Sequence, residues 1–242
     1  TWAFVIGKFM TDPVWWFFLF WLPTFLNGEN ARKVKEFMAA FPADANTHKV
    51  NEFLASHPDY AGSLSNIPGV DFPGVISWPL AVALIYTISG FGSILGGWLP
   101  KKFINGGMDA NRARKLSMFI YALFPLTVLF ATRLGAINTW FAVATIAIAC
   151  SAHAAWSANI FTTVSDMFPK KVGAAGTGSV GRAGAVGGIF IAYAAGLLLQ
   201  HYQDMGKREV GSSILFVVCG SAYITAWVMM HLLVPKFKKI VL

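Results

Sequence analysis

Two charged residues, Lys8 and Asp12, lie inside the otherwise apolar stretch GKFMTDPVWWFFLFWLPTFL near the start of the chain. They are four residues apart, so their side chains can form an ion pair on one face of a helix. Charges inside a membrane are costly and normally pair or face a polar cavity. The pattern therefore predicts either a structural ion pair or a charge network that changes when an anion or a proton binds.

Pro13 follows Asp12 directly, and a proline removes a backbone hydrogen bond and favours a kink. Interrupted helices near the middle of the membrane are where transporters bind their ligands. Asp12 lies about 15 Å into its helix if each residue rises about 1.5 Å. The first apolar stretch is therefore a candidate ligand-binding helix.

Arg182 lies at the same predicted depth in the glycine-rich stretch GAAGTGSVGRAGAVGGIFIAYAAGLLL. Small residues at close spacing let helix backbones approach one another. The planar guanidinium suits a carboxylate, which could be that of a substrate or that of Asp12. Substrate binding and a structural Asp12–Arg182 ion pair are both open at this point.

A third set of mostly polar residues occurs in SAHAAWSANIFTTVSDMFP, where His153, Trp156, Asn159 or Ile160, and Thr163 recur at helical spacing. Polar groups that line a cavity beside an aromatic ring could hold a polyhydroxy ligand. A lone histidine is more often a packing residue than a ligand or a proton carrier. The predicted substrate-binding residues are His153, Trp156, Asn159, Thr162, Arg182 and Trp16, with Asp12 and Lys8 as the charge network.

Six apolar segments are long enough to position these residues in a membrane. Of the 242 residues, 56% are hydrophobic and only 12% are charged, about half the charged share of a soluble domain. Each segment can cross a hydrocarbon core of about 30 Å. The sequence therefore predicts an all-α integral membrane protein with six transmembrane helices, at Trp2–Leu26, Trp78–Leu99, Leu116–Arg133, Asn138–Thr163, Val172–Gln200 and Ser212–Val234.

The basic residues between the segments predict the orientation. Two connections and the carboxyl-terminal tail carry ten of them against two acids, Asp109 and Asp166. Basic loops are preferentially cytoplasmic, so both ends of the chain are expected in the cytoplasm. The ten basic residues are Lys101, Lys102, Arg112, Arg114, Lys115, Lys170, Lys171, Lys236, Lys238 and Lys239.

The long connection on the other side, residues 28–77, contains an internal repeat. NARKVKEFMAAFP and NTHKVNEFLASHP share several positions at an offset of 16 residues, and each ends at a proline, Pro42 or Pro58. Their apolar residues have helical spacing. The pattern predicts two short amphipathic helices that serve either as a cap at the lipid interface or as a lid over an access path.

Other classes of function have little support in the composition. The five histidines are scattered and form no HExxH motif, and the two cysteines lie inside apolar segments with no CxxC motif, so a metalloenzyme is not indicated. The net charge of +8 follows membrane topology and does not indicate nucleic acid. The chain begins at Thr1, inside or against a membrane helix, and it is expected to be a fragment.

The stretches GKFMTDPVWWFFLFWLP and WSANIFTTVSDMFP, with the glycine-rich helix that contains GAVGGI, resemble a known family. They are similar to the carboxyl-terminal half of the anion:cation symporters of the major facilitator superfamily. The greatest similarity is to hexuronate transporters, which import glucuronate and galacturonate with protons. The resemblance covers nearly all of residues 1–242.

This resemblance implies that the six segments are family helices seven to twelve. It implies secondary active transport by alternating access in a bacterial inner membrane, with a proton as the coupling ion, no other cofactor and no enzymatic activity. Polar residues at or near Asn159, Thr162 and Arg182 would hold the sugar. The missing amino-terminal six-helix half would be the partner, and the lipid bilayer and a small carboxylate substrate the other two.

Two features depart from the family pattern. Arg182 stands where the family usually has a neutral residue, and the repeated insert is longer than expected. The alternatives that remain are a carrier of an aldonate, a glucarate or an aromatic carboxylate, a membrane enzyme, and a passive membrane subunit.

Overall fold

Long helices make up most of the computed structural model, which describes residues 2–60 and 62–237, without the side chains of residues 170–172, 208 and 209. No strand occurs in these ranges. The all-α fold with six long apolar helices is confirmed. The elements are α1 (Trp2–Ala40), α2 (Ala45–Ser56), η1 (Leu64–Asn66), α3 (Trp78–Asn105), α4 (Ala110–Leu123), η2 (Phe124–Phe130), α5 (Ala131–Ile137), α6 (Thr139–Met167), α7 (Lys170–Asp204) and α8 (Arg208–Leu233).

The third span differs from the other five because it is built from three pieces, α4, η2 and α5. Pro125 lies in the first turn of η2 and lacks the backbone donor that an α-helix needs. The hydroxyl of Thr127 donates hydrogen bonds to the carbonyls of Phe124 and of Thr145 on α6. These bonds fasten the 3₁₀ segment to its neighbour at the point where the α-helical pattern stops.

The first copy of the repeat is not a separate short helix, so that part of the prediction is wrong. It continues α1, which runs through Pro13 and Pro23 to Ala40. Arg32 pairs with Glu29 at 2.9 Å and with Glu36 at 2.5 Å, and such pairs support an exposed helix. Only the second copy forms a helix of its own, α2, which Asp44 caps by accepting a hydrogen bond from the backbone N–H of Asn46.

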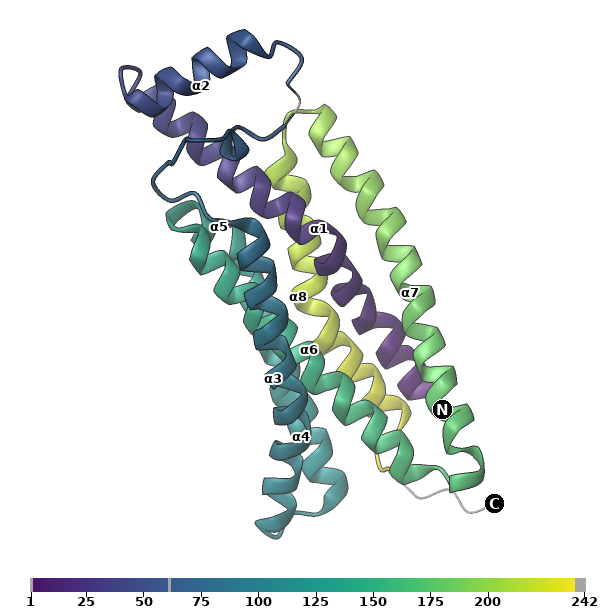
Figure 1. Cartoon of the computed structure of the whole chain (residues 1–242). Helices are drawn as coiled ribbons and strands as arrows, with labels where there is room; N and C mark the ends of the chain where they lie inside the picture. The colour runs from purple at the N-terminus through teal and green to yellow at the C-terminus, as the bar shows by residue number, and fades with distance from the viewer. Residues whose placement is uncertain (1, 61, 238–242) are drawn as a thin grey trace.

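A small separate core holds the segment after α1 in place. Val34 on α1 packs with Val50 of α2 and with Ile67 and Phe72 of the following loop. Asn30 is buried and exchanges two hydrogen bonds with the backbone of Ile76, at 2.8 and 3.1 Å. We call α2, η1 and their loops, residues 41–77, the cap. It extends beyond one end of the bundle (Figure 1) and packs against α1.

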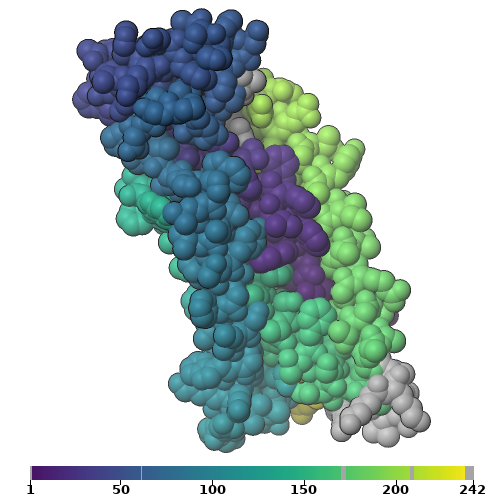
Figure 2. Space-filling view, in the orientation of Figure 1, coloured from purple at the N-terminus to yellow at the C-terminus, as the bar shows by residue number. Residues whose placement is uncertain are grey.

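In the bundle, α1 runs between α7 on one side and α3 and α6 on the other (Figure 1). In the space-filling view α1 is exposed as a strip between α3 and α7 (Figure 2). Close approach depends on glycine: a Cβ on Gly187 would lie 2.6 Å from the carbonyl of Phe9, and one on Gly96 would lie 2.6 Å from that of Ala155. The glycines of α7 and α3 thus allow two pairs of helices, α1–α7 and α3–α6, to pack closely.

At the end opposite the cap, which we call the basic end, Lys115 fastens the end of α8 to α4. Its ammonium donates hydrogen bonds of 2.6 Å to the carbonyls of Val234 and Pro235. The indole N–H of Trp227 on α8 donates to the carbonyl of Lys115. Two of the predicted basic residues of the tail, Lys238 and Lys239, lie outside the described residues, as do the side chains of Lys170 and Lys171.

Candidate functional site

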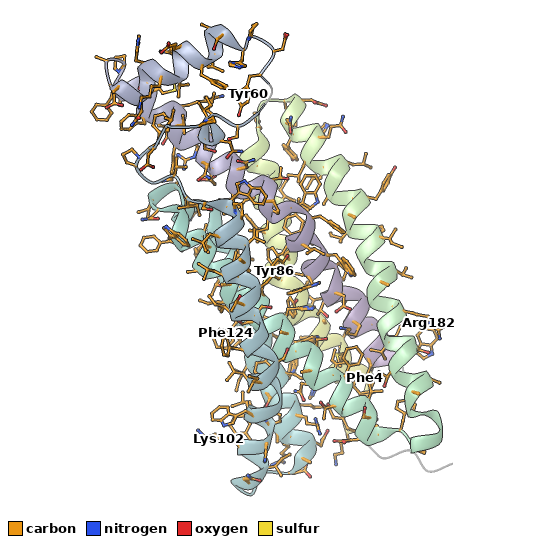
Figure 3. All side chains as sticks on the ribbon, in the orientation of Figure 1. Phe4, Tyr60, Tyr86, Lys102, Phe124 and Arg182 are labelled. Carbon is orange, nitrogen blue, oxygen red and sulfur yellow. The ribbon has the colours of Figure 1, made fainter. Side chains whose placement is uncertain are left out.

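A cavity of about 560 Å³ lies between α1, α3 and α6. Tyr86, Ser89 and Ser93 line it from one face of α3, because three and four residues make about one helical turn. The hydroxyl of Tyr86 is buried and has no hydrogen-bond partner in the described part of the chain, and Figure 3 shows this residue midway along the bundle. The remaining lining residues are Trp15, Gly90, His153, Ala154, Ser157, Ala158 and Phe161.

The Lys8–Asp12 ion pair that the spacing predicts is confirmed, with Lys8 Nζ 2.7 Å from Asp12 Oδ1. The Lys8 side chain is only 4% exposed. Its ammonium also donates a 2.9 Å hydrogen bond to Ser157 Oγ and lies 4.7 Å from the centre of the Phe161 ring. Since Ser157 and Phe161 line the cavity, a buried cation stands directly behind the cavity wall.

His153 joins this ion pair to the cavity. Its Nε2 lies 4.0 Å from Asp12 Oδ1, and its Nδ1 is 2.7 Å from the hydroxyl of Tyr223 on α8. The imidazole also stacks on Trp15, with ring centres 5.2 Å apart and planes at 17°. Four helices thus supply one connected set of groups, since α1, α6 and α8 carry these residues and α3 brings Tyr86 to the edge of Trp15.

Asp12 also lies against the backbone of α7. A Cβ at Gly184 would overlap the Asp12 carboxylate, so no larger residue could stand there without moving it. A Cβ at Gly188 would likewise overlap the indole of Trp16. Trp16 is partly buried and stacks on Phe20 with ring centres 5.9 Å apart. Trp16 therefore packs against α7, and it does not line the cavity.

The other predicted residues of α6 do not line the cavity. Trp156 is fully buried in the core, edge-on to Tyr223. Asn159 donates to the backbone carbonyl of Arg114 on α4 at 3.1 Å and accepts from its guanidinium at 3.3 Å. Successive residues of a helix turn by about 100°, so Asn159 points away from Ser157. Trp156 lies one turn after His153 and contacts Tyr223 as His153 does, but neither Trp156 nor Asn159 lines the cavity. A substrate role for them remains a prediction.

Thr162 is exposed, and its hydroxyl donates to the carbonyl of Ala158 on its own helix. Arg182 is exposed as well, points away from α1 at the edge of α7 (Figure 3), and contacts Ser179 at 3.4 Å. Of the two alternatives left open for Arg182, the structural Asp12–Arg182 ion pair is wrong, because Asp12 is paired with Lys8 and meets α7 at Gly184. The structure therefore groups Lys8, Asp12 and His153, and separates them from Thr162 and Arg182.

Seven residues of this site were not singled out from the sequence: Trp15, Tyr86, Ser89, Ser93, Ser157, Phe161 and Tyr223. The spacing of Tyr86, Ser89 and Ser93 on one face of an otherwise apolar helix was a detectable signal. Ser157 was detectable too, since it lies one turn after His153. Tyr223 gave no such signal, because a tyrosine in an apolar segment is common.

Comparison with known protein families gives no family whose model matches the chain, and no curated protein matches it. The function is therefore inferred from the helices and from the geometry of this site.

Proposed function

We propose that the chain is the carboxyl-terminal half of a proton-coupled transporter of sugar-acid anions, with hexuronates as the first candidates. The observation that carries this proposal is the buried Lys8 ammonium behind the wall of a cavity lined by hydroxyl and aromatic groups. A cation of this kind suits a carboxylate. The cavity volume falls within the roughly 300–1,000 Å³ that small-molecule sites occupy.

Each part of a hexuronate has a matching group in this site. Lys8 and Ser157 lie where its carboxylate could be bound. Tyr86, Ser89 and Ser93 offer hydroxyls to the sugar hydroxyls, and the unpaired Tyr86 oxygen gains a partner when one of them binds. The ring of Trp15 supplies an aromatic wall. Alternating access then needs a second six-helix half that rocks against this one, and the resemblance implies that an amino-terminal half supplies it.

The proposal is tested by uptake of labelled glucuronate into vesicles that contain the full-length protein, with and without an inward proton gradient. Uptake driven by the gradient is expected, and Lys8→Gln should abolish it. Tyr86→Phe removes only one hydroxyl and should lower the affinity roughly threefold to tenfold. If wild-type vesicles take up no glucuronate, hexuronates are excluded as substrates. If Lys8→Gln vesicles transport glucuronate normally, the substrate carboxylate does not bind at Lys8.

A carrier of another organic anion is the second candidate, because the same cation and the aromatic faces of Trp15 and Phe161 also suit an aromatic carboxylate. Competition separates the two: an aldonate, a glucarate or an aromatic carboxylate that displaces glucuronate at lower concentration identifies the better substrate. A passive subunit would bind none of them.

We further propose that the chain lies in a bacterial inner membrane with the basic end in the cytoplasm. Lys101 and Lys102 of α3 and Arg112, Arg114 and Lys115 of α4 gather at this end, which supports the orientation. A cysteine introduced at Asn105 should react with an impermeant thiol reagent only after the cells are opened. A cysteine at Ser65 in the cap should react in intact cells, and the reverse pattern would invert the topology.

A further inference from the structure

The space between Asp12 and His153 is suited to a single proton. The Tyr223 hydroxyl has one proton and two possible acceptors, and we place this proton on the hydrogen bond to the backbone carbonyl of Thr11, at 3.3 Å. The 2.7 Å contact between Tyr223 and His153 Nδ1 then has the imidazole as donor. A neutral imidazole with its proton on Nδ1 presents a bare Nε2, and this atom faces Asp12 Oδ1. Two acceptors therefore face each other.

The distance between those acceptors is 4.0 Å, which is longer than a hydrogen bond of about 2.7–3.2 Å. A proton on Nε2 would turn the pair into an imidazolium and a carboxylate, which attract each other. Closing the gap by about 1 Å would then give a charge-assisted hydrogen bond. On the other side of the carboxylate, the α7 backbone at Gly184 leaves no room to move, so the movement is directed toward α6.

We propose that a proton from solution binds His153 Nε2, that Asp12 then exchanges Lys8 for His153, and that Lys8 becomes the partner of the substrate carboxylate. This inference rests on the proposed function and adds its coupling site. The charges balance at each step. Before binding, Lys8 and Asp12 neutralise each other. Afterwards His153 and Asp12 form one neutral pair, and Lys8 and the substrate form another, so one proton enters with one carboxylate.

Because of the position of Lys8, this exchange of partners needs little movement of its ammonium. Its ammonium already contacts Ser157 Oγ at 2.9 Å and the face of Phe161, and both residues line the cavity. The ammonium therefore stays in place while its anion changes. Without the proton, a substrate carboxylate would meet the Asp12 carboxylate at the same cation, and like charges at that separation repel. Proton and anion are thus expected to bind together.

The charged and titratable neighbours agree with this assignment. In the part of the chain that the structure describes, α1 contributes Lys8, α8 contributes the Tyr223 hydroxyl, and α3 contributes Tyr86 through its contact with Trp15. α7 meets Asp12 with the backbone of Gly184, and its Arg182 is exposed and points away. The thiols of Cys150 on α6 and Cys219 on α8 are buried and free. Among these neighbours, His153 is the imidazole that faces the Asp12 carboxylate.

The test is calorimetry of glucuronate binding to the full-length protein in lipid nanodiscs, in buffers of different ionisation enthalpy, which counts the protons that binding takes up. The wild type should take up about one proton per glucuronate between about pH 5 and 8. His153→Asn keeps a polar atom for Tyr223 but has no Nε2, so it should bind glucuronate more weakly than the wild type, because Asp12 keeps its charge, and with no proton uptake. Asp12→Asn frees Lys8 permanently and should bind with an affinity that does not change with pH.

A matched control is His201→Asn, since His201 is exposed on α7, and this variant should keep the full proton uptake. Wild-type binding without proton uptake would overturn the inference and leave sugar-acid binding intact. Proton uptake that persists in His153→Asn would overturn it too. If the wild type binds no glucuronate, hexuronates are excluded as substrates, and the inference fails together with the hexuronate form of the proposed function.

Discussion

The bundle contains two clusters that join α6 to another helix through a basic residue, and they differ in what surrounds them. At the cavity, Lys8 and Asp12 are 4% and 14% exposed and touch residues that line open space. At the basic end, Arg114 of α4 pairs with Asp166 of α6, and Asp166 is 59% exposed. The first cluster has an alternative partner, His153, at 4.0 Å. In the second cluster, Asn159 accepts a hydrogen bond from the Arg114 guanidinium and donates one to the Arg114 backbone carbonyl.

This difference teaches that residue type alone does not mark a site. Arg114, Asn159 and Thr163 would suit an anion by their chemistry, yet Arg114 contacts Asn159 and Thr163 in a close α4–α6 contact. A charged group can act on a ligand when it borders a cavity and has a second stable arrangement. The Lys8–Asp12 cluster borders the cavity, and the exchange proposed above gives it a second arrangement through His153. The Arg114–Asp166 cluster serves as a clamp.

The largest effect is expected for Lys8→Gln, which leaves the Asp12 carboxylate buried without its cation. Breaking a buried pair in this way costs about 3–5 kcal/mol of stability, and glucuronate binding should be lost. Thermal unfolding in nanodiscs and calorimetry measure the two effects. The double variant Lys8→Gln, Asp12→Asn should recover stability but not binding, and recovered binding would contradict the role of Lys8.

The next effect concerns the α3–α6 contact on which the cavity depends. A Cβ at Gly92 would overlap the backbone carbonyl of Ser151, so Gly92→Ala should cost about 1–3 kcal/mol. It should also weaken binding, because Ser89 and Ser93 move with α3. Gly97→Ala is the matched control, since a Cβ there meets nothing within 4 Å. Equal unfolding temperatures for the two variants would argue against this packing.

A smaller effect is expected for Arg114→Gln in the other cluster. Its partner Asp166 is largely exposed, so solvent screens the pair, and the loss should be about 1 kcal/mol or less. Glucuronate affinity should stay at the wild-type value in the same calorimetric assay. If binding is lost to a greater extent than stability, Arg114 contributes to the substrate path, and the contrast between the two clusters is wrong.

The smallest effect is expected for Arg182→Gln, because Arg182 is exposed and contacts Ser179 at 3.4 Å. Stability should change by no more than about 0.5 kcal/mol, and glucuronate uptake should be unaffected. Uptake that is lost while the protein remains folded would return Arg182 to the substrate-binding role that its sequence context predicts.

Much of the fold follows from patterns within single segments. The six spans are set by length and hydrophobicity, and the Lys8–Asp12 pair is set by a spacing of one turn. The predicted end of the first helix at Leu26 was wrong, because α1 continues through the first copy of the repeat, which was expected to form a separate short helix. Ion pairs around Arg32 support this part of α1. The site was predicted less well. His153, Lys8 and Asp12 were found, but the hydroxyl groups of α3 were not.

The sequence by itself determined the membrane class, the number of long helices and the local charge pair, because each depends on neighbours within about one turn or one span. Tertiary structure decided which side of each helix faces the cavity. Polar residues lie on two sides of α6. The close packing of Gly92 and Gly96 of α3 against Ser151 and Ala155 of α6 fixes the orientation of α6. In that orientation His153 and Ser157 line the cavity. The rotation of a helix about its axis depends on all its neighbours at once, so no single segment specifies it.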